Sequence, residues 1–208
     1  MPYYIRVLGS QDPDIHIDEL IEALKQDGLT AKFEIDPSEK AGKWTTFDLF
    51  NAKGQALAQI DRNPVIDSEL GQDELNEFRE IIQEYKPISA VKWLTNYFDS
   101  VKVIYAFQLL NPAFHEDNFE IVFNIKAKIW NKVKGILQAD NEGFSNEDGY
   151  HILWQFSDNV TGDCSCAVNN SSGTWDNFIM DLGDIMQRKE FQNGDVPNNA
   201  RRLLGRPN

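Results

Sequence analysis

The run Val101–Leu110 constrains the fold more than any other segment, because polar side chains hardly interrupt it. A strand of this composition is expected to be buried on both faces, which requires other elements above and below it. Apolar residues at helical spacing precede and follow the run, at Ile88–Phe98 and at Phe119–Lys134. The sequence therefore predicts an interior strand in a sheet that helices cover.

Other segments have the spacing of strands, hairpins and helices. A strand is predicted at Tyr3–Leu8, and a hairpin at 44–60 around Asn51-Ala-Lys-Gly54. Three later segments predict a three-stranded meander: Tyr150–Phe156, Cys164–Val168 and Thr174–Met180. Shorter strands are expected at 31–35 and 136–139, and further helices at 17–28, 72–85 and 184–191. We expect an α+β (or α/β) fold with a mixed, largely antiparallel sheet and about four or five helices.

The two halves of the chain share an order of strand, helix, strand, hairpin and helix. In this alignment the hairpin at 44–60 corresponds to residues 150–168. The pattern predicts two fused βαβββ-type half-domains, 1–99 and 100–195, packed as one compact unit and followed by a tail at 196–208. The alternative is that two unrelated hairpins alternate in the same way, since residue identities between the halves are nearly absent.

The balance of charge limits the partners that this chain can take. It carries 33 acidic and 20 basic side chains, a net charge of −13 over 208 residues, and its aromatic content of 12% is that of a folded protein. Such a surface repels nucleic acid and anionic membranes and attracts basic protein faces. We therefore expect no direct nucleic-acid binding and no membrane binding. The one basic cluster is small against this field: Arg201, Arg202 and Arg206.

A cytoplasmic location is expected, because the sequence shows neither a secretory signal nor an apolar run of membrane-spanning length. Cys164 and Cys166 are poorly spaced for a disulfide on one strand, which fits a reducing compartment. We interpret the sequons at Asn159, Asn169 and Asn170 as turn residues.

The segment Ala139–Gly149 is the most acidic loop and is a candidate binding site. Its carboxylates are oxygen ligands of the kind that Ca²⁺ or Mg²⁺ prefers. The spacing of a calcium-binding EF-hand is absent, because position six of the loop is Ser145 and position twelve is His151. We therefore predict no metal site and interpret the loop as solvated. Its aromatic residue either packs on the core or is offered to a partner. The candidate binding residues are Asp140, Glu142, Phe144, Glu147 and Asp148.

Two histidines are candidates for catalysis. His115 stands beside Glu116 and Asp117 just after the apolar run, where a proton carrier would suit an active site. The alternative is that Asp117 or Asn118 caps the next helix. His151 could join Cys164 and Cys166 as three ligands of a soft metal ion. The alternation of side chains along a strand, however, turns the histidine away from the cysteines, which are better interpreted as buried hydrophobes. No phosphate loop, dinucleotide fingerprint or hydrolase elbow occurs, so we expect no cofactor.

Three stretches resemble an uncharacterised family of bacterial, in particular cyanobacterial, proteins: Lys92–Phe98, Ile104–Leu110 and Gly143–Phe156. The resemblance extends over most of the chain and implies a bacterial cytosolic origin. It implies no activity, because that family has no assigned catalytic residues.

The sequence predicts a non-enzymatic acidic binding protein, an adaptor or inhibitor that acts on a partner protein with a basic surface. One alternative is a small cation-dependent hydrolase that uses the 140–151 loop, and the other is a structural or assembly subunit. The oligomeric state stays open.

Overall fold

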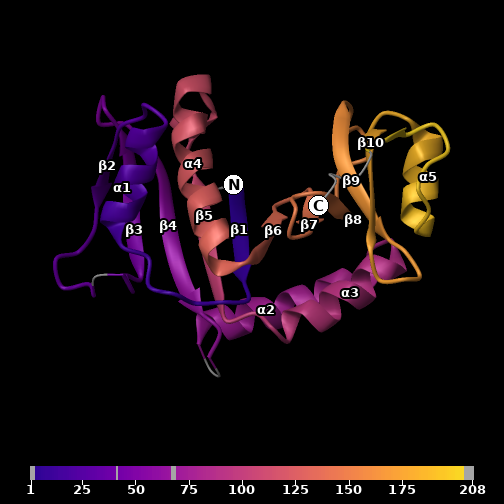
Figure 1. Ribbon diagram of the computed structural model, residues 1–208, viewed down its shortest axis with the longest axis horizontal. Coiled ribbons are helices and arrows are strands. Elements are labelled where there is room, and N and C mark those ends of the chain that lie inside the picture. The colour runs from indigo at the N-terminus through magenta and orange to yellow at the C-terminus, as the bar shows by residue number, and fades with distance from the viewer. Residues whose placement is uncertain (1–2, 41, 67–68, 204–208) are drawn as a thin grey trace. The chain divides into compact units, whose positions relative to one another are not determined.

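The computed structural model describes residues 3–40, 42–66 and 69–203 and has the predicted α+β fold (Figure 1). In these residues there are five α-helices and eleven strands, whose pairing is mixed and largely antiparallel. The chain divides into two compact units. Unit 1 is Met1–Asp73 with Val101–Gly135, and unit 2 is Glu74–Ser100 with Ile136–Asn208. The units therefore interleave along the chain and do not coincide with the halves expected at 1–99 and 100–195.

Unit 1 is built on five antiparallel strands in the order β1-β5-β4-β3-β2. Their bounds are β1 Tyr3–Gly9, β2 Ala31–Glu34, β3 Thr46–Asn51, β4 Ala56–Pro64 and β5 Val103–Leu109. The apolar run forms β5, which lies between β1 and β4 with nearly every side chain buried. The predicted hairpin is also present, since β3 pairs with β4 around the Asn51–Gly54 turn.

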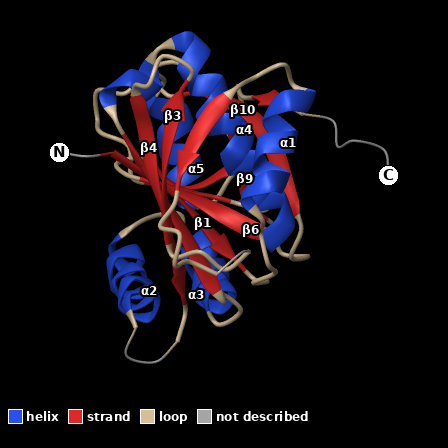
Figure 2. Ribbon diagram, turned by 90° about the vertical axis from the view of Figure 1, so that its left-hand side faces the viewer, coloured by secondary structure: helices blue, strands red, loops and turns tan. Residues whose placement is uncertain are grey.

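Helices α1 (Ile17–Gln26) and α4 (Glu116–Val133) pack side by side in unit 1 (Figures 1 and 2). An ion pair between Glu19 and Lys132 joins them. The short helix η2 (Asn111–Phe114) leads from β5 into α4. The N-cap of α4 is His115, so the prediction of Asp117 or Asn118 as the cap was wrong. The apolar stripe of α4 is buried as its period predicts: Ile121, Val122, Ile125, Ile129 and Val133.

Unit 2 contains the remaining strands, in the order β6-β7-β8-β9-β10-β11. Their bounds are β6 Gly135–Ala139, β7 Gly143–Ser145, β8 His151–Trp154, β9 Asp163–Asn169, β10 Trp175–Asp181 and β11 Arg201–Arg202. Helix α2 (Leu70–Ile81) runs through η1 (Ile82–Glu84) toward α3 (Ile88–Phe98), and α5 (Ile185–Asn193) follows β10. The expected tail thus contributes a strand, which pairs with β10. Arg206 lies outside the described residues.

The predicted meander was wrong at its first step, because β8 and β9 pair in parallel, His151 opposite Cys166. The connection between them doubles back and is fastened by Arg188 of α5. Its guanidinium donates hydrogen bonds to the backbone carbonyls of Asp158 and Val160, at 2.7 and 2.6 Å. Residues 150–168 therefore form no hairpin equivalent to 44–60. This removes the correspondence on which two fused βαβββ half-domains were predicted.

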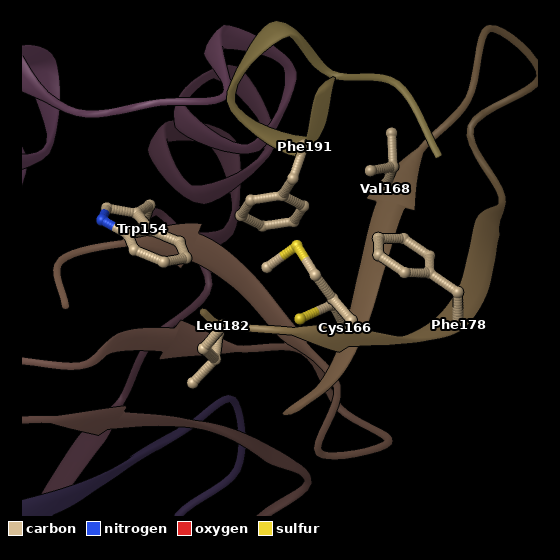
Figure 3. Packing of buried hydrophobic residues seen from close by; sticks show 7 residues of the cluster. Trp154, Cys166, Val168, Phe178, Leu182 and Phe191 are labelled. Atoms are coloured by element: carbon tan, nitrogen blue, oxygen red, sulfur yellow. The ribbon is translucent and has the colours of Figure 1, made fainter. Parts of the chain in front are cut away.

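A hydrophobic cluster fills the space between α5 and strands β9 and β10 of unit 2. Figure 3 shows Phe191 of α5 facing Cys166 of β9 and Phe178 of β10. Cys166 is fully buried, and Cys164 packs against the edge of the same cluster. Helix α5 is capped by Asp184, whose carboxylate accepts hydrogen bonds from the N–H groups of Met186 and Gln187. Cys166 is thus a small buried hydrophobe, as the sequence indicates, whereas Cys164 is only partly buried.

In the part of the chain that the structure describes, no helix is both long enough and apolar enough to cross a bilayer.

Candidate binding site on helix α4

The acidic segment 139–149 forms a strand and a tight turn. Gly143–Ser145 is strand β7, which the sequence did not predict, and a hairpin turn at Asn146–Gly149 joins it to β8. The side-chain oxygen of Asn146 accepts hydrogen bonds from the backbone N–H groups of Asp148 and Tyr150, at 3.1 and 2.9 Å. The acidic residues Glu147 and Asp148 occupy the two middle positions of this turn because such turns favour short or polar side chains.

The carboxylates of this loop do not converge on a common point. Glu142, Glu147 and Asp148 are exposed, and Asp140 is half-buried. Across residues 3–40, 42–66 and 69–203, no cluster of three or more His, Cys, Asp or Glu side chains could hold a metal ion. Partial desolvation, together with the charge of Asp148, raises the pKa of Glu147 above its ordinary value. The geometry therefore resembles a solvated turn more than a ligand cage.

Phe144 is part of the core of unit 2 and is not available to a partner. Its side chain is 1% exposed. The ring packs edge-on against Phe78 at 5.5 Å between centroids and lies 5.7 Å from Phe98 of α3. Its place in the candidate binding set must be corrected, because apolar area drives an aromatic side chain inward even from a polar loop.

His151 is also enclosed, so its predicted catalytic role does not fit its position. It is 5% exposed, and its imidazole lies 4.7 Å from the ring of Phe156 and 6.2 Å from that of Phe191. Burial lowers the pKa of His151 to about 3, so the imidazole is neutral in the folded protein. The alternation of side chains along a strand predicted that His151 faces away from the core. This was wrong, because all four residues of β8 are buried and the register shifts between β7 and β8.

His115, in contrast, is exposed and lines a pocket of about 410 Å³ in unit 1. We call this the His115 pocket. Three segments that are distant in sequence meet there: the α1–β2 connection, the β3–β4 turn and the first turns of α4. The lining residues are Gly28, Leu29, Thr30, Asn51, Ala52, Lys53, Gln55, His115, Asp117, Asn118 and Ile121.

Two buried asparagines fasten the β3–β4 turn to α4 beneath this pocket. The Nδ2 group of Asn51 donates hydrogen bonds to Oδ1 of Asn118, at 3.0 Å, and to Oε1 of Gln55, at 2.9 Å. The Nδ2 group of Asn118 donates in turn to the carbonyl of Pro112 at 2.9 Å. Because their polar groups are paired, Asn51 and Asn118 hold the pocket in a fixed shape. The sequence did not indicate either residue as part of a site.

An apolar groove of about 570 Å³ adjoins this pocket along α4, and the two share Leu29. We call it the α4 groove. Phe119 and Phe123, one helical turn apart, are 44% and 52% exposed and stack on each other with their centroids 6.4 Å apart. The rim carries Asp27, which accepts a hydrogen bond from Asn124, and Glu120. The groove thus combines exposed aromatic surface with two carboxylates.

A second apolar stripe on α4 is the sequence signal that indicates this groove. Phe119 and Phe123 are spaced i, i+4 and lie off the buried stripe of Ile121, Ile125 and Ile129. A helix that buries one stripe and exposes another of aromatic residues has more apolar surface than its own core uses.

Comparisons with family models, with curated proteins and with solved structures find no match for this chain. The resemblance to an uncharacterised bacterial family gains no support from them and stays a prediction.

Proposed function

We propose that this protein is a non-enzymatic acidic binding protein, and that a basic segment of a partner protein docks in the α4 groove. The observation that carries this proposal is the stacked, half-exposed pair Phe119 and Phe123 beside the carboxylates of Asp27 and Glu120. Aromatic side chains dominate the binding energy of protein interfaces, and they rarely lie exposed in pairs without a partner.

Charge supports the same type of partner. The net charge of −13 would repel an acidic partner and speed the approach of a basic one. The charged lining residues of the groove are Asp27 and Glu120, and beside them the ammonium of Lys126 lies 4.8 Å from the ring centroid of Phe123. The occupant that fits is a segment with a large apolar side chain flanked by lysine or arginine. The apolar side chain would cover Phe119 and Phe123, and the cations would pair with the rim.

The two other predicted functions lack a supporting feature. A cation-dependent hydrolase based on the 140–151 loop would need an accessible histidine and a cluster of ligands, but His151 is buried, and no three His, Cys, Asp or Glu side chains of the described residues are grouped to hold a metal ion. An assembly subunit stays a prediction. A cytoplasmic inhibitor or adaptor remains part of the proposal.

The test uses a defined probe, a synthetic amphipathic peptide of lysine, leucine and tryptophan. Its affinity is measured by titration calorimetry against the intact protein and against a Phe119→Ala/Phe123→Ala variant. We expect the double substitution to weaken binding by about tenfold or more, because truncating a central aromatic anchor costs over 1 kcal/mol. The affinity for the unchanged protein should also fall as NaCl is raised.

The matched control removes two exposed hydrophobes elsewhere, in Ile185→Ala/Met186→Ala, which lie in unit 2 and are 63% and 62% exposed. This variant should bind like the unchanged protein. Equal loss in both variants, or equal binding of the same peptide with glutamate in place of lysine, would refute the proposal.

A further inference from the structure

We infer that the His115 pocket binds a carboxylate group of the segment that occupies the α4 groove. This inference rests on the proposed function, because it assigns a second contact to the same partner. The pocket and the groove meet at Leu29, so one continuous segment can reach both.

The pocket differs from the rest of this acidic protein in the groups that line it. Lys53, His115, Thr30 and the amide nitrogen of Gln55 are hydrogen-bond donors, and all four residues are exposed. The ammonium of Lys53 enters none of the ion pairs of the described residues. The Oε1 atom of Gln55 accepts a hydrogen bond from Asn51, so its amide nitrogen is the group of this side chain that remains as a donor. Such a lining matches a ligand rich in acceptors.

One side chain opposes this preference. Asp117 is the only carboxylate among the lining residues, and its charge would repel an anion that approached it closely. Asp117 lies in the first turn of α4 next to His115, whereas Lys53 lies in the β3–β4 turn, so we place the carboxylate on the Lys53 side of the pocket. The hydrogen-bonded pair Asn51 and Asn118 holds these two segments together, at 3.0 Å. The donors are therefore in place before a ligand arrives.

The groove and the pocket together determine the orientation in which the partner segment binds. The Asp27 and Glu120 end of the groove takes cationic side chains, and the Lys53 end takes an anionic group. The pocket volume of about 410 Å³ is in the range of sites for small groups and is ample for one carboxylate with its waters. The carboxylate could come from the free C-terminus of the partner or from an Asp or Glu side chain.

The experiment compares three forms of the lysine, leucine and tryptophan peptide: a free C-terminus, an amidated C-terminus, and an amidated form with one terminal glutamate. We expect the two carboxylate forms to bind about tenfold more tightly than the plain amide, as one charge-assisted hydrogen-bonded pair allows. A preference for only one of the two forms identifies the source of the carboxylate. Equal affinity of all three forms would overturn the inference while leaving the groove proposal intact.

The variants localise the effect. Lys53→Met should abolish the difference between the peptide forms, whereas Lys189→Met, an exposed lysine of unit 2, removes the same charge and should preserve it. Persistence of the difference in Lys53→Met would also overturn the inference.

A second probe separates the inference from the proposed function. N-acetylglycine is titrated alone into the protein, and the NMR signals of His115 and Thr30 are followed. Shifts of these signals in the unchanged protein, lost in Lys53→Met, support the pocket even if no peptide binds the groove. Absence of any shift at these residues, with no discrimination among the peptides, refutes it.

Discussion

Two turns of this protein have the same construction and different surroundings. In Asn51–Gly54 of unit 1 and in Asn146–Gly149 of unit 2, the asparagine side chain accepts hydrogen bonds from two backbone N–H groups that follow it. Each turn ends on a glycine with positive φ, 78° in Gly54 and 84° in Gly149, a conformation that other residues adopt at a cost. The asparagine and the glycine therefore fix both turns locally.

Their neighbours decide what the two turns do. The Asn51 amide reaches across to Asn118 of α4, and Lys53 lines a pocket. The Asn146 amide nitrogen has no hydrogen-bond partner, and the acidic pair Glu147 and Asp148 that follows it is exposed. Acidic residues in a turn can therefore be present only because turns favour polar side chains. A binding site requires, in addition, side chains from segments that are distant in the sequence.

The largest effect on stability is expected from a comparison of two phenylalanines, one buried in unit 2 and one half-exposed in unit 1. Phe144→Ala should lower the free energy of unfolding by about 3–5 kcal/mol, because it opens a cavity in a packed core. Phe123→Ala should change it by less than about 0.5 kcal/mol, because that ring is half-exposed. Chemical denaturation measures both, and peptide affinity should show the reverse order. Similar losses of stability in the two variants would contradict the contrast.

The buried His151 should couple the stability of this protein to pH. His151 has a pKa of about 3 when folded and an ordinary value of 6.5, so the unfolded state binds more protons between these values. Its contribution to stability is complete above about pH 6.5 and falls by about 1.4 kcal/mol for each pH unit below that.

Denaturation at several pH values between neutrality and mild acid measures this slope. His151→Gln should reduce the slope, because it removes the buried group that binds a proton on unfolding. An unaltered slope in His151→Gln would show that other groups carry the acid sensitivity.

The two asparagines of the matched turns give an intermediate effect. Asn51→Ala and Asn146→Ala should each cost about 1–3 kcal/mol of stability, because two part-buried backbone N–H groups of each turn lose their acceptor. Only Asn51→Ala should also weaken discrimination between the acid and amide peptides, since it frees the β3–β4 turn from α4. If Asn146→Ala weakened the discrimination between the peptides equally, the assignment of a binding role to the Asn51 turn alone would be refuted.

The smallest effects separate the acidic turn from the acidic rim of the groove. Glu147→Gln/Asp148→Asn and Asp27→Asn/Glu120→Gln each remove two exposed charges, and each should alter stability by less than about 0.5 kcal/mol. The second pair should weaken binding of the basic peptide several-fold and the first should not, because Asp27 and Glu120 line the groove and Glu147 and Asp148 do not. Titration calorimetry at low salt measures the peptide affinity of both variants. An equal loss of affinity in the two would mean that binding depends on net charge alone and not on the rim of the groove.

The order and type of most elements could be predicted from local patterns. Helix α3 begins and ends at the predicted residues, and the hairpin of β3 and β4 follows from its Asn-x-x-Gly turn. The residues of β7 were missed because the strand is three residues long and bounded by polar side chains. Its turn was interpreted as a site because the carboxylates were more conspicuous than the asparagine and glycine that shape it.

The candidate site itself was only partly predictable. His115 was identified from its position after the apolar run, yet Lys53, Asn51 and Leu29 were not, since they lie 62, 64 and 86 residues earlier in the chain. Phe119 and Phe123 were visible as apolar residues, but a sequence pattern does not state which of two stripes on a helix is covered.

By itself the sequence determined the fold class, the helices and the tight turns, because these depend on the period of apolar residues and on backbone conformation within a few positions. Tertiary structure alone decided the parallel pairing of β8 with β9, the burial of Phe144 and His151, and the meeting of three segments around the His115 pocket. These features depend on contacts between residues far apart in the chain, and the free energy of such contacts is set by packing that no local pattern encodes.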